Sequence, residues 1–368
     1  MNILIVGFGN AGSGIAADLA IKGHRITVLK TSDAVHVRHF DQVLSERKIM
    51  LVEKGVSRVA RLDCLTKDPQ EAFKTYPDII IVTTQSLHHE RVFGIISPFL
   101  GEETIVLLEP GNGGSLLLAQ FKLPKGISIA EATSTPLDVR VRLGQKVLLL
   151  VRHVRNPLGF FPMAENAQAL RRLQVLYPNF YCLGHTLAAA LHNPNLIVHT
   201  VGSLLNVARI EYSDGDFWMY KEGFTKSVWN VIEALDAEKI EVLKRLNADP
   251  IPYLEIAKIR NAEDLSIDAR AMFDIYCQTG SPKGPSNINT RYIYEDVPKG
   301  LVLLESLGVL VKCKTPTTSM LIDLANTYTK EDFRKTGSSL QRLGIAEHTV
   351  ESLLAVLNSG IGSDEAAR

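Results

Sequence analysis

The pattern of apolar and polar positions changes about half-way along the chain. Before about residue 180, short apolar runs alternate with stretches in which apolar residues recur every three or four positions. The short apolar runs predict strands that are buried on both faces, and the spacing of three or four predicts helices. The predicted strands are 2–6, 25–29, 59–64, 78–82, 103–108, 126–130 and 146–151, and the predicted helices are 10–22, 69–74 and 87–99. Alternating strands and helices predict a parallel sheet wound in βαβ units.

After about residue 182 the apolar positions have mainly helical spacing. The predicted helices are 186–208, 225–246, 262–275, 300–311, 317–327 and 349–357, and Gly and Pro lie mostly between them. A chain of 368 residues is long enough for two cores. The sequence therefore predicts an α/β domain over residues 1–180, followed by an all-α domain over residues 181–368.

Composition and charge exclude several classes of protein. Forty Lys and Arg balance forty Asp and Glu, so the basic excess typical of nucleic-acid binding is missing. No apolar stretch approaches the eighteen or so residues that cross a bilayer. The chain begins directly with a strand pattern, and its four cysteines are scattered, without ligand-like spacing. We therefore expect a cytoplasmic protein with reduced thiols, no metal site and no nucleic-acid or membrane partner.

A glycine-rich turn follows the first predicted strand. Gly7, Gly9 and Gly12 form the pattern G-x-G-x-x-G, with Asn10 and Ala11 at the start of the next helix. Gly7 permits a tight turn, Gly9 lets the backbone approach a pyrophosphate, and Gly12 allows close packing of helix and strand. The amino end of the helix then attracts the phosphates. This context predicts a Rossmann domain that binds a dinucleotide.

The residues after the second strand indicate which dinucleotide is used. NAD-binding domains usually carry an acidic residue there for the ribose 2′-hydroxyl. This chain has Lys30, Thr31 and Ser32 instead. A cation attracts a 2′-phosphate, and Arg38 lies nearby in sequence, so NADP(H) is favoured over NAD(H). The alternatives are that Asp33 turns back to the ribose, or that Lys30 is only solvated.

Three further polar residues follow predicted strands. Thr83 and Thr84 come after the fourth strand, and Asn112 lies in a second glycine-rich turn after the fifth. Ligands of open parallel sheets bind beyond the carboxyl ends of the strands. We therefore expect these three side chains to face the cofactor.

Two segments of the second half carry groups for proton transfer and anion binding. His192, Asn195 and His199 lie in the first, and Asn195 and His199 share a helix face. Arg291 and Asp296 lie in the second. A dehydrogenase needs a proton donor and a carboxylate anchor beside its cofactor. Each of these residues also has a purely structural interpretation, such as a core histidine or an ion pair of Arg291 with a neighbouring carboxylate.

The two segments, behind the glycine-rich turn, resemble the octopine/nopaline-type opine dehydrogenases. That family shows N-x-x-x-H-P in the first segment, where this chain has Asn195 and His199 but Thr200 in place of the proline. It shows R-Y-x-x-E-D-[VI]-P-x-G-L in the second, which residues 291–301 match throughout. The resemblance implies NAD(P)H-dependent condensation of an α-keto acid with the amino group of an amino acid, and reduction to a secondary amine.

The resemblance also assigns roles to individual residues. His199 is implied as the acid/base, and Asp296 as the carboxylate that fixes its tautomer and stabilises its protonated form. Arg291 is suited to hold the keto acid's carboxylate, and Asn195 to donate a hydrogen bond to that carboxylate or to the reacting oxygen. His192 is a second candidate for the substrate site.

Two other functions remain open at this stage. One is a reductase of a simple 2-keto or 3-hydroxy acid, as in the ketopantoate reductase or 6-phosphogluconate dehydrogenase lineages. Those enzymes carry a lysine proton donor on the first long helix of the helical domain, whereas this chain has no Lys between Arg172 and Tyr220. The other is a non-catalytic NADP(H) sensor. The identities of the keto acid and the amine and the oligomeric state, a homodimer included, are not determined by the sequence.

Overall fold

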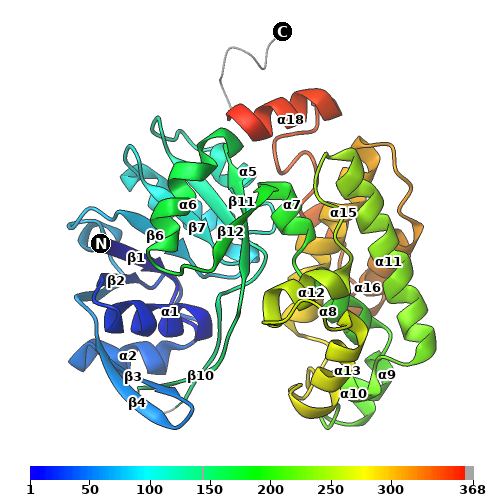
Figure 1. Ribbon diagram of the computed structural model, residues 1–368, viewed down its shortest axis with the longest axis horizontal. Helices are drawn as coiled ribbons and strands as arrows, with labels where there is room; N and C mark the ends of the chain where they lie inside the picture. The colour runs from blue at the N-terminus through cyan, green and yellow to red at the C-terminus, as the bar shows by residue number, and fades with distance from the viewer. Residues whose placement is uncertain (143–144, 361–368) are drawn as a thin grey trace. The chain divides into compact units, whose positions relative to one another are not determined.

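The computed structural model of the chain describes residues 1–142 and 145–360. It divides into two compact units, Met1–Cys182 and Leu183–Arg368, which are drawn from blue to green and from green to red in Figure 1. Residues 361–368 of the predicted second domain lie outside the described residues.

An eight-stranded, mainly parallel sheet forms the centre of the first unit. Its strand order is β12-β11-β8-β7-β6-β1-β2-β5. β1 pairs in parallel with both β2 and β6, whereas β11 runs antiparallel to β8. The strands are β1 (Asn2–Val6), β2 (Arg25–Leu29), β5 (Cys64–Thr66), β6 (Ile79–Val82), β7 (Ile105–Leu108), β8 (Ser128–Ala132), β11 (Asn156–Phe161) and β12 (Phe180–His185).

The central strands are buried on both faces, as their continuous apolar sequence predicts. Every residue of β6 and β7 is buried. Helix α1 packs on one side of the sheet and belongs to the core with Ile15 and Leu19. The helices of this unit are α1 (Asn10–Ile21), α2 (Val37–Glu46), α3 (Pro69–Ala72), α4 (His89–Ile96), α5 (Gly114–Ala119) and α6 (Asn166–Gln174), with short 3₁₀ turns at Ser86–His88, Ser97–Phe99 and Met163–Glu165.

A second sheet of four strands was not predicted. It consists of β4 (Val56–Arg61), β3 (Lys48–Glu53), β10 (Lys146–Arg152) and β9 (Leu137–Val141), in that order. The prediction of 146–151 as a strand of the parallel sheet was therefore wrong, and the predicted strand 59–64 is divided between β4 and β5. Helix α2 was missed because neither of its ends carries the usual glycine signal. The boundary residues His36 and Arg47 have φ of 53° and 52° without being glycine.

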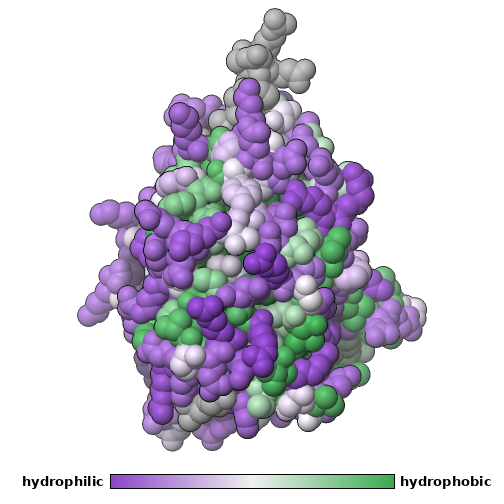
Figure 2. All heavy atoms as spheres, turned by 90° about the vertical axis from the view of Figure 1, so that its left-hand side faces the viewer, coloured by the Kyte–Doolittle hydropathy of each residue, from purple (hydrophilic) through white to green (hydrophobic). Residues whose placement is uncertain are grey.

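Ion pairs centred on the buried carboxylate of Asp18 tie this small sheet to helix α1. Arg152 on β10 donates to Asp18 on α1 at 2.6 Å and to Glu53 on β3 at 2.6 Å. Asp18 also pairs with Lys22 at 3.1 Å. The face of the first unit in Figure 2 is mainly hydrophilic, with separate apolar spots. Val56, Val59 and Leu150 of the small sheet are among the exposed apolar residues.

The second unit is built of helices, as predicted, although their boundaries differ in places from the predicted ones. The predicted helix 186–208 is divided into three helices, because one new helix begins directly after Pro194 and another directly after Asn206. The helices are α7 (Thr186–Leu191), α8 (Asn195–Leu204), α9 (Val207–Tyr212), α10 (Met219–Glu222), α11 (Lys226–Arg245), α12 (Tyr253–Asn261), α13 (Ala269–Thr279), α14 (Arg291–Tyr294), α15 (Val302–Leu310), α16 (Pro316–Thr329), α17 (Phe333–Thr336) and α18 (Val350–Ser359).

A π-helical turn, Val297–Leu301, connects α14 to α15. It follows directly on Asp296, and all five of its residues are buried. Single π turns inside helical segments are frequent at functional sites. Within the described residues, no helix is long and apolar enough to cross a membrane, and no group of three or more His, Cys, Asp or Glu side chains could hold a metal ion.

Candidate active site

The turn between β1 and α1 has the geometry that a bound pyrophosphate requires. Gly7 has φ of +105°, in the left-handed region that favours glycine. A Cβ on Gly12 would lie 2.2 Å from the carbonyl oxygen of Gly7, so only glycine fits there. A Cβ on Gly9 would meet only His36, at 3.5 Å, and this position is open to a ligand. Asn10 and Ala11 begin α1, whose first turn carries no acidic residue. These features fit a dinucleotide phosphate.

Two threonines at the end of β6 form the wall beside this turn. The hydroxyl of Thr83 donates to the carbonyl oxygens of Val6 and Gly7, at 3.2 and 3.3 Å. A Cβ on Gly7 would lie 2.9 Å from that hydroxyl and 3.0 Å from the Thr84 methyl. The hydroxyl of Thr84 is buried and has no hydrogen-bond partner among the residues that the structure describes. It is therefore available to a ligand in the turn.

Lys30 lies at the end of β2, but its ammonium group is engaged with the backbone. Its Nζ donates to the carbonyl oxygen of Val35 at 2.7 Å, and the residue is 4% exposed. Burial lowers its pKa. Ser32 accepts a hydrogen bond from Ala34, so both side chains also shape this loop. Asp33 is exposed and pairs with Lys67 at 2.6 Å, so its carboxylate faces another cation.

The side chain of Arg91 also reaches the loop after β2, although no sequence pattern predicts it. It projects from α4 and donates to the carbonyl oxygen of Thr31 at 2.7 Å. Its guanidinium therefore stands beside the loop of Thr31 and Ser32. No motif marks Arg91, because it comes from the helix after β6, and β6 and β2 lie on either side of β1.

Asn112 lies in the loop after β7 and is held in a left-handed conformation, with φ of 53°. Its side-chain amide donates to the Ser86 hydroxyl at 3.1 Å. The buried carboxylate of Glu131 accepts from the backbone nitrogens of Gly113 and Ser115, at 3.0 and 2.7 Å. The loop is therefore fixed at the carboxyl end of β7.

His199 and Asp296 meet in the second unit. The Nδ1 of His199, on α8, lies 2.8 Å from Oδ2 of Asp296, which follows α14. The two residues are only 6% and 4% exposed. A carboxylate at Nδ1 favours the tautomer with the proton on that nitrogen, and Nε2 of the neutral ring is then unprotonated.

Burial is the main influence on the electrostatics of His199. It lowers the pKa of the imidazole below the usual 6.5, although the hydrogen bond and the charge of Asp296 act in the opposite direction. The charge of Arg291 also lowers this pKa. A lowered pKa favours the neutral imidazole near neutral pH, whereas the sequence analysis expects Asp296 to favour the protonated form.

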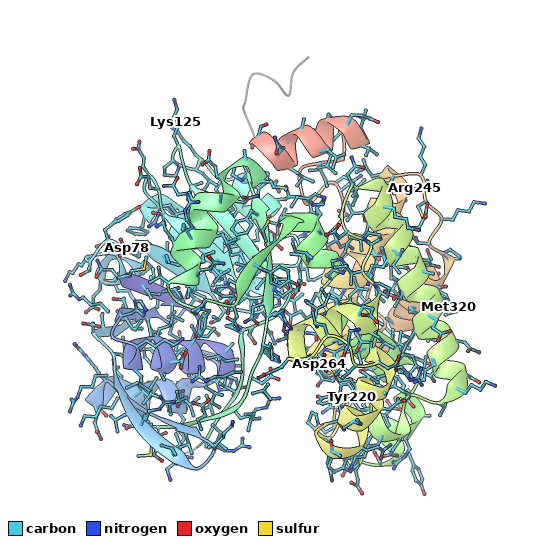
Figure 3. All side chains as sticks on the ribbon, viewed as in Figure 1. Asp78, Lys125, Tyr220, Arg245, Asp264 and Met320 are labelled. Carbon is cyan, nitrogen blue, oxygen red and sulfur yellow. The ribbon has the colours of Figure 1, made fainter. Side chains whose placement is uncertain are left out.

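Two residues of α14 lie close to His199. The ring of Tyr292 stacks on the imidazole, with 3.6 Å between ring centroids and 9° between planes. Arg291 has a half-exposed side chain and stands 3.9 Å from a carboxylate oxygen of Glu295, at the limit of an ion pair. Asn195, one turn before His199 on α8, is partly buried. Tyr220, which is labelled in Figure 3, belongs to an aromatic cluster with Phe224, Phe273 and Tyr276.

His192 is buried and contacts the backbone. It is 2% exposed, and its Nε2 lies 2.9 Å from the carbonyl oxygen of Asp249. Burial and the charge of Lys239 lower its pKa to about 3, so the imidazole is neutral. Its place in the substrate site stays a prediction.

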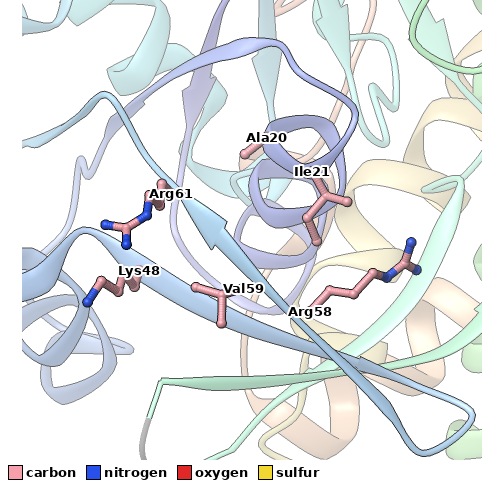
Figure 4. Close-up of a pocket in the computed structure, with 6 residues that line it drawn as sticks. All are labelled: Ala20, Ile21, Lys48, Arg58, Val59 and Arg61. Atoms are coloured by element: carbon pink, nitrogen blue, oxygen red, sulfur yellow. The ribbon is translucent and has the colours of Figure 1, made fainter.

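The hollow shown in Figure 4 contains none of the predicted site residues. It lies between α1 and the small sheet of the first unit, and is lined by Ala20, Ile21, Lys48, Arg58, Val59 and Arg61. Lys48 and Arg58 are paired with Glu46 and Glu53, so neither cation is an open anion site.

Comparisons with known proteins agree with this arrangement. The family described as NAD/NADP octopine/nopaline dehydrogenase, alpha-helical domain, matches residues 182–329, and ketopantoate reductase PanE/ApbA matches residues 3–118. The chain is 30% identical to an opine dehydrogenase of Arthrobacter sp. (strain 1C), over 95% of this chain and 96% of that protein.

The chain belongs to the opine dehydrogenase family. The resemblance seen in the two sequence motifs is thereby confirmed, together with the order of a Rossmann-type domain followed by a helical domain. It is an oxidoreductase that acts on CH–NH donors with NAD(P). The reaction of this family is the NAD(P)H-dependent reductive condensation of an α-keto acid with an amino acid.

Solved structures share the fold. Octopine dehydrogenase with NADH and L-arginine has a TM-score of 0.77 and 18% identity, over 96% of this chain and 98% of that one. Yersinopine dehydrogenase with NADP⁺ has a TM-score of 0.73 and 16% identity, over 98% of both chains. One of these two proteins was solved with NADH and the other with NADP⁺, so the fold accepts either form of the dinucleotide.

Proposed function

We propose that this opine dehydrogenase uses His199 as its acid/base, with Asp296 behind it, and prefers NADPH. The observation that carries the proposal is the 2.8 Å contact between Nδ1 of His199 and Asp296. It leaves Nε2 as the nitrogen for proton exchange. The substrates are an α-keto acid, such as pyruvate or 2-oxoglutarate, and an amino acid.

Neutral His199 first takes a proton from the ammonium group of the amino acid. The free amine then forms a bond to the keto carbon, and a carbinolamine results after proton transfer from nitrogen to oxygen. The imidazolium of His199 returns its proton to the hydroxyl of this intermediate. The C–O bond breaks, water leaves, and the imine is formed as its iminium ion. The proton balance closes, because His199 ends neutral.

Asp296 supports both states of the imidazole. Its carboxylate accepts the Nδ1 proton throughout, so that Nε2 is free to accept and then donate. The dinucleotide, when bound, supplies the hydride that reduces the imine carbon. Gly7, Gly9, Asn10, Ala11, Gly12, Thr83, Thr84 and Asn112 are the residues that would hold it.

Arg291 and Asn195 would hold the keto acid. The guanidinium of Arg291 can form two parallel hydrogen bonds to a carboxylate. Its side chain is half exposed and only weakly engaged by Glu295, so it is available for a substrate anion. Asn195 starts the turn that ends at His199, and its amide can donate to the same carboxylate or to the reacting oxygen.

A matrix of keto acids against amino acids tests the reaction. We expect oxidation of NADPH, followed at 340 nm, only when both substrates are present. Mass spectrometry should then detect a secondary-amine dicarboxylate. Turnover with a keto acid alone would instead indicate a simple reductase, and binding of NADPH without any turnover would indicate a sensor.

The preference for NADPH is supported by the cations around the end of β2. Lys30 and Arg91 both donate to the backbone of this loop, and the carboxylate of Asp33 pairs with Lys67. A 2′-phosphate would meet positive charge here, whereas a 2′-hydroxyl would find no free carboxylate among these side chains. Because the reaction consumes reduced cofactor and metabolic acids, the cytoplasm is the compartment that we propose.

Replacement of Arg91 tests this preference. In Arg91→Met we expect the KM for NADPH to rise about tenfold, since one exposed charge-assisted hydrogen bond is lost. The KM for NADH should change little. Initial rates with both cofactors measure the ratio, and Arg58→Met on β4 is the control for loss of a surface cation. Equal changes with NADPH and NADH would contradict recognition of the 2′-phosphate.

A further inference from the structure

The contact between Tyr292 and His199 has no role in the reaction described so far. The two rings are nearly parallel, and their centroids are 3.6 Å apart. Neutral aromatic rings usually pack edge-on, tilted or offset. The other ring pairs found among the described residues of this unit do so, with angles of 53° to 86° between planes. Two nearly parallel pairs occur in the first unit, Phe8–His39 and Phe73–Phe99, but their ring centroids are 5.0 Å apart. The rings of His199 and Tyr292 are therefore distinguished by their short centroid distance, which places them face to face.

We propose that Tyr292 is a positioning residue for His199, and that its ring fixes the plane in which Nε2 exchanges its proton. This inference rests on the proposed role of His199. Asp296 holds the imidazole at a single atom, Nδ1, at 2.8 Å. One hydrogen bond leaves the ring free to tilt about that contact. A second ring lying flat against the imidazole removes this freedom.

The spacing of the motif explains how one turn supplies both restraints. Tyr292 lies in α14, and Asp296 follows it by four residues. Residues four apart lie on the same side of a helical turn. The backbone keeps its helical hydrogen bonding here, because Glu295 donates to Arg291 and Lys299 donates to Glu295, both at 2.9 Å. A single turn therefore places a carboxylate at the edge of the imidazole and a phenol on its face.

Tyr292 also lies next to the cation of the site. The guanidinium carbon of Arg291 is 5.7 Å from the centroid of the Tyr292 ring. The face of an aromatic ring is electron-rich and favours a nearby cation. The charge of Arg291 disfavours the imidazolium that forms during turnover, because both groups are cations. The electron-rich face of the Tyr292 ring favours this imidazolium and so opposes the effect of Arg291. Its aromatic face, more than its hydroxyl, supplies this effect.

The test compares Tyr292→Phe, which keeps the ring, with Tyr292→Leu, which keeps much of the bulk. NMR titration of the imidazole Cε1–H of His199, assigned among the ten histidines by its loss in His199→Gln, needs no substrate. We expect Tyr292→Phe to titrate like the parent enzyme. In Tyr292→Leu the midpoint should fall by about half a pH unit, because the cation loses its aromatic face.

Steady-state rates complete the test. Tyr292→Leu should lower kcat about tenfold and leave the KM for NADPH unchanged, since a misaligned acid/base slows the chemical step. Circular dichroism and NADPH binding verify that both units are folded. A normal titration and normal kcat in Tyr292→Leu overturn the proposal, as does a Tyr292→Phe variant that is as impaired as Tyr292→Leu. If His199 itself has no catalytic role, His199→Gln retains activity, and this result separates the two failures.

Discussion

His199→Gln should lower kcat for reductive condensation by about 10²–10⁴, the usual contribution of a positioned acid/base. Glutamine keeps the approximate size of the side chain but can neither take the proton of the ammonium group nor return it to the leaving hydroxyl. NADPH binding should persist, because the residues proposed to hold the cofactor all lie in the first unit. NADPH oxidation with saturating keto acid and amino acid gives kcat, and fluorescence titration gives the Kd for NADPH.

The pH dependence follows from the same residue. Burial lowers the pKa of His199 below 6.5, and the neutral imidazole is the form that starts the reaction. In the parent enzyme kcat/KM should therefore rise with pH through a midpoint below 6.5. The enzyme should lose activity on the acid side of that midpoint, because the imidazole is then protonated. This limb should be absent from the residual activity of His199→Gln. His348→Gln is the matched control, since His348 lies just before α18 and contacts Ser352 of that helix. Equal rates in His199→Gln and His348→Gln would refute the assignment.

Gly12→Ala should remove dinucleotide binding and destabilise the first unit. The new Cβ would lie 2.2 Å from the Gly7 carbonyl oxygen and 2.6 Å from the Thr83 hydroxyl. The helix must move away from the strand to relieve this overlap, and the phosphate turn moves with it. We expect the KM for NADPH to rise by about 100-fold or more, by analogy with other displacements of about 1 Å. The overpacking should cost about 1–3 kcal/mol of stability.

Two other glycines separate the effects on stability and binding. Gly94 on α4 has only Phe121 near its Cβ position, at 4.0 Å, so Gly94→Ala should leave NADPH binding unchanged and should not lower stability. Gly9→Ala should keep the stability of the parent protein, because only His36 lies near, but its Cβ would occupy the approach to the pyrophosphate. Thermal unfolding and NADPH titration of the three variants measure both quantities. Tight NADPH binding by Gly12→Ala would show that the turn does not hold the phosphates.

Local sequence patterns determined much of this protein. Continuous apolar strands predict a parallel sheet because both faces are covered, and the glycines of the first turn predict a phosphate site because their backbone geometry excludes side chains. Helical spacing in the second half depends likewise on neighbours in sequence. The motif of residues 291–301 identified the family, since it is long and specific. These features require only short-range contacts, and so they can be read from the chain alone.

Tertiary structure decided the rest. Whether His192 or His199 meets Asp296 depends on how α7, α8 and α14 pack, and only burial shows that the pKa of His199 is lowered. Arg91 reaches the end of β2 from a helix sixty residues later in the chain, and no local pattern records that approach. The four-stranded sheet pairs β3 with β10, almost a hundred residues apart. Such contacts depend on the path of the whole chain, because distant side chains come together only after the core has formed.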